Sequence, residues 1–305
     1  GGGGKVDPNA CGGMNMNDAT KNLKGFLNAA IEMEGALNDV SQELANACAS
    51  MGKRIGLEGF EGNPEKDCPK VVEAIGNNLK VGLKAGASLT IDAKPAVCEV
   101  NVDAAASAAA SCSGSASGSA EVSCSGRCQG ECAGECSGST GEGGACDGVC
   151  KGECKGKCDG HVDVEAEAAC EARAEVKANV YAKCTPPGVT VEFEASAVVD
   201  KPKVEAAVAA LKEGLPVIMR LRGHIGTPDR PGPLLGASMS LAGSAKELVK
   251  SVGGMKDALK DQFMCVSGQL KAAADLAASI QSQFSVQAEI SVSVSASASV
   301  SGEAG

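Results

Sequence analysis

The sequence predicts an α+β fold: a four-helix bundle-like body, a very long antiparallel β-hairpin arm inserted between the helix pairs, and a C-terminal β-strand. Three observations predict it: cysteines placed symmetrically about Gly141, apolar residues at helical spacing on either side of that region, and alternation of small apolar residues with serine near the C-terminus. The expected segments are a flexible glycine-rich start (1–13), a first helical part (14–85), the arm (86–200), a second helical part (201–284) and the strand (285–305).

The two helical parts show the spacing of packed helices. Apolar residues between Leu23 and Met51, and again from Leu241 to Phe284, alternate steps of three and four, which is typical of a helix packed along a partner. Shorter helices are expected at about 68–84 and 201–222. Together these segments suggest a four-helix bundle.

The arm is predicted from the cysteines. Twelve of the sixteen form pairs whose residue numbers sum to 282, and all twelve occupy even positions, so they share one face of a strand. Directly opposed residues of an antiparallel pair lie within disulfide reach. The four pairs nearest Gly141 belong to a regular Cys-x-Gly-x repeat and could be symmetric for that reason alone. The two outer pairs lie outside the repeat, so they support the symmetry about Gly141 independently. The predicted cross-strand disulfides are Cys98–Cys184, Cys112–Cys170, Cys124–Cys158, Cys128–Cys154, Cys132–Cys150 and Cys136–Cys146.

The arm would be long and would expose an apolar face. With roughly 40 residues per strand at about 3.3 Å each, it would extend roughly 130 Å if straight. Its even positions carry alanine, valine, glycine and cysteine, and its odd positions carry polar residues such as Glu131 opposite Lys151. The glycine-rich segment 137–145 is the expected tip, and its contact residues would be Ser139, Thr140, Gly141 and Glu142.

Four cysteines remain for the helical body, and they allow three pairings. We prefer Cys48–Cys68 with Cys11–Cys265, because Cys48 ends one expected helix and Cys68 begins the next. An even number of cysteines arranged for pairing indicates an oxidising compartment, extracellular or at the cell surface. The start Gly1–Gly4 resembles the tether after the lipidated cysteine of bacterial lipoproteins, which suggests a lipid anchor on an upstream residue. This resemblance and the lack of an N-x-[ST] glycosylation sequon favour a bacterial source.

Composition argues against several functional classes. The net charge of −10 and the lack of a basic patch argue against nucleic-acid binding, and no apolar run reaches the length of a transmembrane helix. Catalytic motifs are missing and there are only two histidines, so we expect neither an enzyme nor a bound cofactor or metal.

The expected function follows from the apolar face of the arm, which needs a partner. We expect a structural protein that self-assembles through the arm into a fibre, stalk or sheath. One alternative is an adhesive or binding protein that uses the arm as a spacer and its tip as the contact. Another is a thiol-rich protein whose Cys-x-Gly-x block binds soft metals such as Cu(I) or zinc. A pore-forming hairpin agrees poorly with the arm's length and small side chains.

Overall fold

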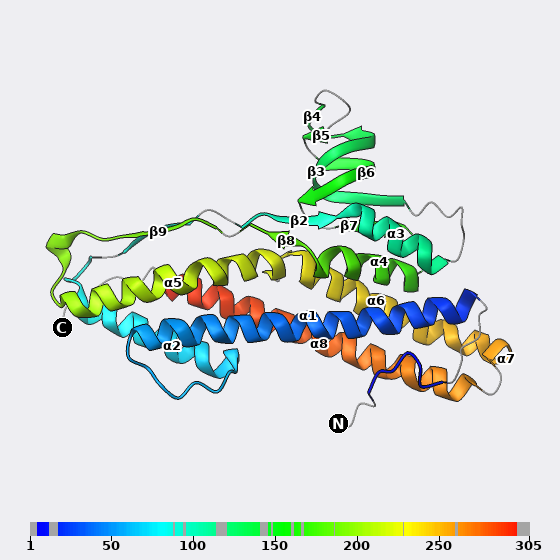
Figure 1. The fold of residues 1–305 in the computed structure, drawn as a ribbon, viewed down its shortest axis with the longest axis horizontal. Coiled ribbons are helices and arrows are strands. Elements are labelled where there is room, and N and C mark those ends of the chain that lie inside the picture. The colour runs from blue at the N-terminus through cyan, green and yellow to red at the C-terminus, as the bar shows by residue number, and fades with distance from the viewer. Residues whose placement is uncertain are drawn as a thin grey trace. The chain divides into compact units, whose positions relative to one another are not determined.

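The computed structural model describes residues 5–11, 18–87, 89–93, 96–113, 121–140, 146–147, 149–159, 162–165, 168–185, 187–227, 229–259 and 262–297 (Figure 1). The chain forms two compact units, and each is built from three separate stretches. Unit 1 contains residues 1–37, 98–183 and 231–284, and unit 2 contains residues 38–97, 184–230 and 285–305. The sequence suggested a helical body made of residues 14–85 and 201–284, with the arm inserted between them.

Two long helices, α1 (Asp18–Arg54) and α8 (Phe263–Ser297), each contribute to both units. The positions with alternating steps of three and four are the buried ones, as an apolar helix face requires. In unit 1 they include Leu23, Phe26, Met33 and Leu37 of α1, and Val266, Leu270, Ala273, Ala277, Ile280 and Phe284 of α8.

Further helices and the N-terminal segment complete the helical part of unit 1. Helix α6 (Pro233–Val252) is followed by the 3₁₀ turn η3 (Gly253–Met255) and the short helix α7 (Lys256–Leu259). A disulfide joins Cys11 to Cys265 of α8, and the Asp7 backbone N–H donates to Oε1 of Gln269 at 2.8 Å. These contacts hold the segment before α1 against α8.

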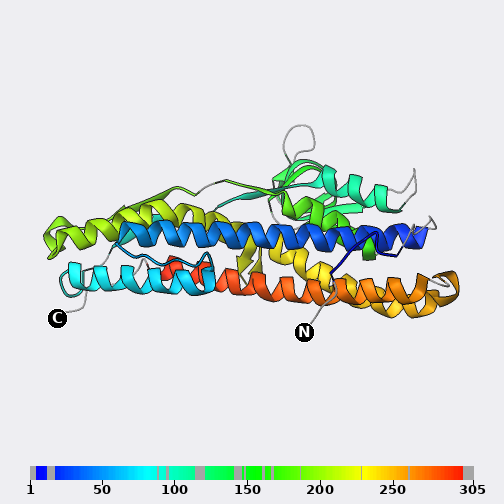
Figure 2. The same cartoon turned by 60° about the horizontal axis from the view of Figure 1, so that its bottom comes forward.

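Two alanine-rich segments of the predicted arm are helices, and the prediction of strands there is wrong. At the base of the arm, residues 90–93 and 189–192 do pair as antiparallel strands, and each pair sums to 282 as predicted. Residues Val102–Ser113 form α3 and Ala168–Val180 form α4, which lie side by side (Figures 1 and 2). An alanine run has no period of its own, and alanine is the strongest helix former. Asn101 supports the start of α3, because its Oδ1 accepts from the Ala104 backbone N–H at 3.1 Å.

Strands form at the centre of the predicted arm and also near Cys98 and Cys184. Their sheet has the order β7-β3-β6-β2-β8, and a small pair, β4 with β5, lies next to the tip. The strands are β2 (Cys98–Asn101), β3 (Glu121–Cys136), β4 (Ser139–Thr140), β5 (Cys146–Asp147), β6 (Val149–Asp159), β7 (Val162–Glu165) and β8 (Lys183–Cys184).

Unit 2 packs α2 (Pro64–Gly82) against α5 (Lys201–Ile225). Asn63 and Asp200 cap these helices, accepting from the backbone N–H groups of Glu65 and Lys203. The smaller elements are the two-stranded sheet of β1 (Thr90–Ala93) and β9 (Val189–Glu192), the 3₁₀ turn η2 (Ala195–Ala197), and the pair β10 (Gly226–Thr227) and β11 (Arg230–Pro231).

The predicted C-terminal strand is also wrong in this structure. Residues from Val286 to Ser297 belong to α8, although they alternate apolar and mostly polar side chains as a strand would. Residues 298–305 lie outside the described part of the chain.

Candidate functional site: the cysteine coil

We call strands β3 to β7 together, within residues 121–165, the cysteine coil. Most of its backbone pairs follow a different axis of symmetry from its disulfides; Cys124 opposite Cys150 and Arg127 opposite Val149 do not. Glu121 lies opposite Glu165 in the antiparallel β3–β7 ladder, Cys128 lies opposite Cys158 in β6, and Ser139 lies opposite Asp147 at the tip; each of these pairs sums to 286. The disulfides are Cys124–Cys158, Cys128–Cys154, Cys132–Cys150 and Cys136–Cys146, which sum to 282.

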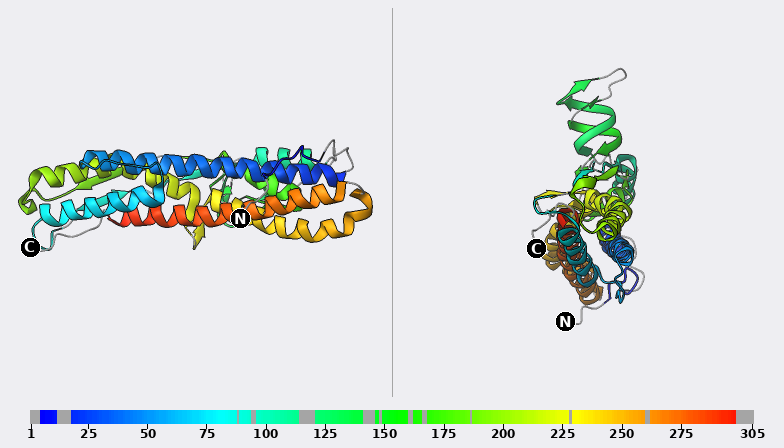
Figure 3. Two further views of the ribbon diagram at one scale, coloured as in Figure 1. Left: turned by 90° about the horizontal axis from the view of Figure 1, so that it is seen from below. Right: turned by 90° about the vertical axis from the view of Figure 1, so that its left-hand side faces the viewer.

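This offset of four residues forces the ribbon to wind. Four residues of an extended strand span about 13 Å, yet the Cα atoms of the bonded cysteines are only 5.6–6.0 Å apart. A straight hairpin cannot satisfy both pairings, because disulfides require Cα atoms within about 7 Å. The right-hand view of Figure 3 shows the resulting coil. Arg127 lies opposite Asp159 and also opposite Val149, and the β3–β6 ladder has register shifts throughout.

The sulfur atoms fill the inside of the coil. Cys124, Cys128, Cys150 and Cys154 are each 1% exposed, and Cys158 is fully buried. They form one buried cluster with the alanines of the flanking helices, namely Ala105 and Ala109 of α3 and Ala174 and Ala178 of α4. We expected a straight arm that exposes its cysteines on an apolar face, and this expectation is wrong. These cysteines are buried inside the coil, and helices cover part of it.

The outside of the coil is polar. Arg127, Glu131 and Glu135 are exposed, and the ladder places them opposite Asp159, Lys155 and Lys151 respectively. Opposite charges on facing strands stabilise a sheet. If the backbone instead paired in the register of the disulfides, symmetric about Gly141, Arg127 would lie opposite Lys155 and Glu135 opposite Asp147. Both pairs are repulsive.

These charges are a signal that the sequence analysis missed. A Cys-x-Gly-x repeat has a period of four, so the cysteines and glycines match equally well after a shift of four residues. Charged residues at the odd positions do not repeat in this way. The structure's ladder has three oppositely charged pairs at these positions and one like-charged pair, Glu121 with Glu165, so the charges favour it overall.

The structure also pairs the cysteines outside the coil. It joins Cys11 to Cys265 and Cys48 to Cys68, the same pairing that we preferred from the sequence. Cys98, Cys170 and Cys184 are disulfide-bonded as well. The side chain of Cys112, predicted to bond Cys170, lies outside the described part of the structure.

The tip is closed by the last disulfide of the coil. Beside Cys136–Cys146, the Ser137 backbone N–H donates to the Val149 carbonyl at 3.0 Å, and the Val149 N–H donates to Oγ of Ser137 at 3.1 Å. Two predicted contact residues, Ser139 and Thr140, form β4. The other two, Gly141 and Glu142, lie outside the described residues.

The chemistry of the coil is that of disulfides. Soft metals bind thiolates, and a cysteine in a disulfide offers no thiolate. The metal-binding alternative therefore depends on reduction of the coil. In the part of the chain that the structure describes, no group of three or more His, Cys, Asp or Glu side chains is arranged to hold a metal ion.

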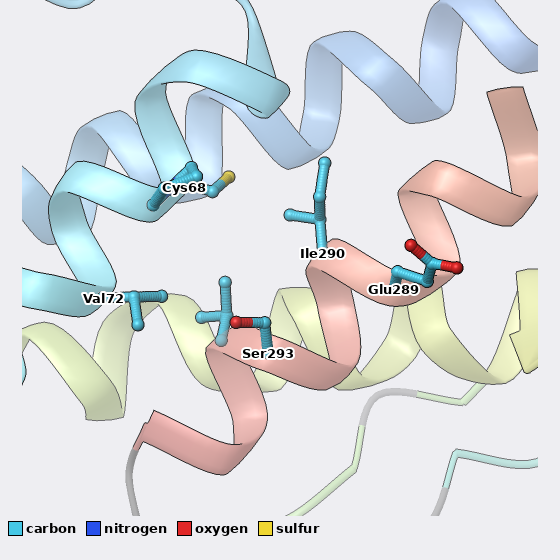
Figure 4. Close-up of a pocket in the computed structure, with 7 residues that line it drawn as sticks. Cys68, Val72, Glu289, Ile290 and Ser293 are labelled. Atoms are coloured by element: carbon cyan, nitrogen blue, oxygen red, sulfur yellow. The ribbon is translucent and has the colours of Figure 1, made fainter.

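Among the described residues of unit 2, two hollows lie beside the last turns of α8, and Figure 4 shows the one next to α2. One, of about 200 Å³, lies between α2 and α8 and is mainly apolar; the other, of about 460 Å³, is more polar. Glu289 and Ser293 of α8 line both. The first is also lined by Cys68, Pro69, Val72, Ile290 and Val294, and the second by Arg222, Thr227, Asp229 and Val292.

Electrostatic contacts in unit 2 hold helices together. Oγ of Ser50 donates to Glu213, and Arg54 pairs with the same carboxylate at 2.5 Å. The hydrogen bond from Ser50 and then the contact with Arg54 hold the pKa of Glu213 below its ordinary value. Arg220 of α5 also pairs with Glu43 of α1. These pairs connect α5 to the end of α1.

Comparison with known proteins adds no assignment. No protein-family model, curated protein sequence or solved structure matches this chain. Among the helices of the described residues, none is both long and apolar enough to cross a membrane.

Proposed function

We propose that this chain is a self-associating structural protein of an oxidising compartment, extracellular or at a cell surface, and that it works without catalysis. The observation that carries the proposal is the disulfide-filled interior of the cysteine coil, where four bridges lie within residues 124–158. Such a density of disulfides is typical of secreted proteins that cannot build a large apolar core.

The coil provides resistance to unfolding and proteolysis. A disulfide typically stabilises a fold by about 2–4 kcal/mol, although nested bridges do not add fully. In Cys124–Cys158 and Cys128–Cys154 both cysteines are buried, which also limits access by reductants.

The structure changes how self-association into a fibre, stalk or sheath would occur. The coil buries the cysteine face that the sequence analysis assigned to stacking, so another surface has to make contacts between copies. The glycines Gly1–Gly4, on which the expectation of a lipid anchor depends, lie outside the described residues.

Two measurements test the proposal. We expect protease digestion of the oxidised chain to leave a resistant fragment that contains residues 121–165, and reduction to abolish that resistance. We expect light scattering to show particles larger than the monomer as the concentration of oxidised protein rises. A chain that stays monomeric at every concentration, or a coil that is digested as fast as the loops, would contradict the proposal.

A second candidate is adhesion through the tip, favoured by the way Cys136–Cys146 and the Ser137–Val149 hydrogen bonds hold β4 and β5 in place. Replacing Ser139, Thr140 and Glu142 by glycine would then abolish binding to a cell or matrix surface and leave protease resistance and particle formation unchanged. Loss of particles in this variant would argue against a separate adhesive role.

A further inference from the structure

The last turns of α8 differ from the rest of that helix. From Val266 to Phe284 the buried positions are all apolar and follow steps of four and three. The same steps continue to Gln287, Ser291 and Val294, so a helix here must bury two polar residues. Meanwhile Val286, Ile290 and Val292 are only half-buried.

The cause is a conflict between two periods. From Val286 onward the apolar residues stand at every second position, which is the period of a strand. A helix distributes such residues around its circumference, whereas a strand places Val286, Ala288, Ile290, Val292, Val294 and Ala296 on one face. The other face of that strand would hold Gln287, Glu289 and the serines.

The helix is weakly held where this conflict occurs. Gln287 is 4% exposed, its Nε2 reaches Oγ of Ser41 only at 3.4 Å, and its Oε1 has no hydrogen-bond partner among the described residues. A buried polar atom without a partner destabilises the state that buries it. The hydroxyls of Ser291 and Ser295 donate back to the carbonyls of Ala288 and Ser291, a pattern that slightly destabilises helices.

The packing and the composition of these last turns also indicate a weakly held helix. Glu289 and Ser293 line both of these hollows of unit 2, so neighbouring elements do not fully cover this part of α8. Figure 4 shows the hollow next to α2. Valine and serine are weaker helix formers than alanine or leucine. From Ile290 to Ser297 there is no charged residue, no proline and no glycine.

We propose that residues 286–297 are a helix-to-strand switch that pairs with the same segment of a second copy of this chain. The inference rests on the self-association proposed above and supplies the surface that the cysteine coil lacks. As a strand, the segment removes Gln287 from the interior and gathers its apolar side chains on one face. Its part from Ile290 to Ser297 is uncharged and lacks proline, which is typical of segments that pair with identical copies, and Glu289 lies on the polar face of the strand.

The test compares variants within one helix. Ser293→Lys places an ammonium group one turn after Glu289, an arrangement that favours a helix and places charge in the strand. Ser279→Lys is the matched control, because Ser279 is also exposed and lies one turn after Asp275. Gln287→Leu is a second variant, which makes the buried helix face apolar. All are made in the full-length, oxidised chain.

Particle formation is followed by light scattering and the segment by hydrogen exchange. We expect residues 286–297 of the monomer to exchange at least tenfold faster than residues 263–284, and to become protected in particles that show intermolecular β-sheet by infrared absorption. Ser293→Lys and Gln287→Leu should slow particle formation at least tenfold, and Ser279→Lys should not.

The outcomes separate this inference from the proposed function. If particles form while residues 286–297 keep helical protection, or if Ser293→Lys behaves as Ser279→Lys does, the switch is wrong and self-association stands. If the wild-type chain forms no particles at any concentration, self-association is wrong and the switch falls with it.

Discussion

The cysteine coil and the pair of helices beside it, α3 and α4, occupy the inner and outer parts of one symmetric cysteine pattern, yet they fold differently. The inner part alternates cysteine and glycine at every second position and forms a wound ribbon. The outer part is rich in alanine and forms helices. Symmetric cysteines therefore indicate which residues meet in a disulfide, whereas the residues between them decide the conformation of the chain.

The largest expected effect comes from removing a buried disulfide of the cysteine coil. Replacing Cys128 and Cys154 by serine should destabilise the coil by about 2–4 kcal/mol, and the buried hydroxyls would add to this loss. Hydrogen exchange should show residues 121–165 opening while α1 keeps its protection. Replacing Cys136 and Cys146, which close only the tip, should have a smaller effect. Equal loss from both pairs would contradict a stability centred on the buried sulfurs.

The second prediction tests the outer part. Ala106→Pro should destabilise α3 by about 3 kcal/mol, because proline removes a backbone donor and clashes within a helix. Circular dichroism should show a loss of helix, and hydrogen exchange should place that loss at residues 102–113. Ala106→Ser is the control and should change stability by about 0.5 kcal/mol. An unchanged helical signal in the proline variant would show that this part is not helical.

A third, smaller effect tests the register of the coil. Arg127→Glu places like charges opposite each other at Asp159, so we expect a loss of about 0.2–1 kcal/mol in the stability of the coil. Pairing about Gly141 predicts the opposite sign, because the new carboxylate would then face Lys155. Hydrogen exchange of residues 121–165 measures the difference, with Arg127→Gln as the uncharged control.

The smallest effect is a pH dependence in unit 2, which contrasts with the coil because disulfide cysteines do not titrate. The pKa of Glu213 is lowered when folded, so its contribution is present above its ordinary value of 4.5 and is lost as the pH falls through the lower folded pKa. Glu213→Gln should be less stable than wild type at pH 7, and the difference should vanish in acid. Exchange of α5 amides from pH 7 to pH 3 measures it; a constant difference would contradict the assignment.

The helices with apolar residues at steps of three and four were predictable. From Leu23 to Met51 and from Val266 to Phe284, this spacing agrees with a helix and not with a strand. The disulfides at Cys124–Cys158 and its neighbours agree with the pairs taken from the cysteine positions. The winding of the ribbon was not predictable from those positions, since a period of four hides a shift of four. Residues 104–110 were assigned to a strand because their six alanines, interrupted only by Ser107, show no helical period of apolar residues.

The period of four has a consequence for the length of the coil. One extra Cys-x-Gly-x unit in each strand would add another rung and keep every cysteine inside and every charged position outside. The same unit added to one strand alone would leave the cysteines matched and the charges mismatched. The coil can therefore be lengthened in steps of four residues by duplicating one unit in each strand. Its length can change while its buried residues stay of the same kind.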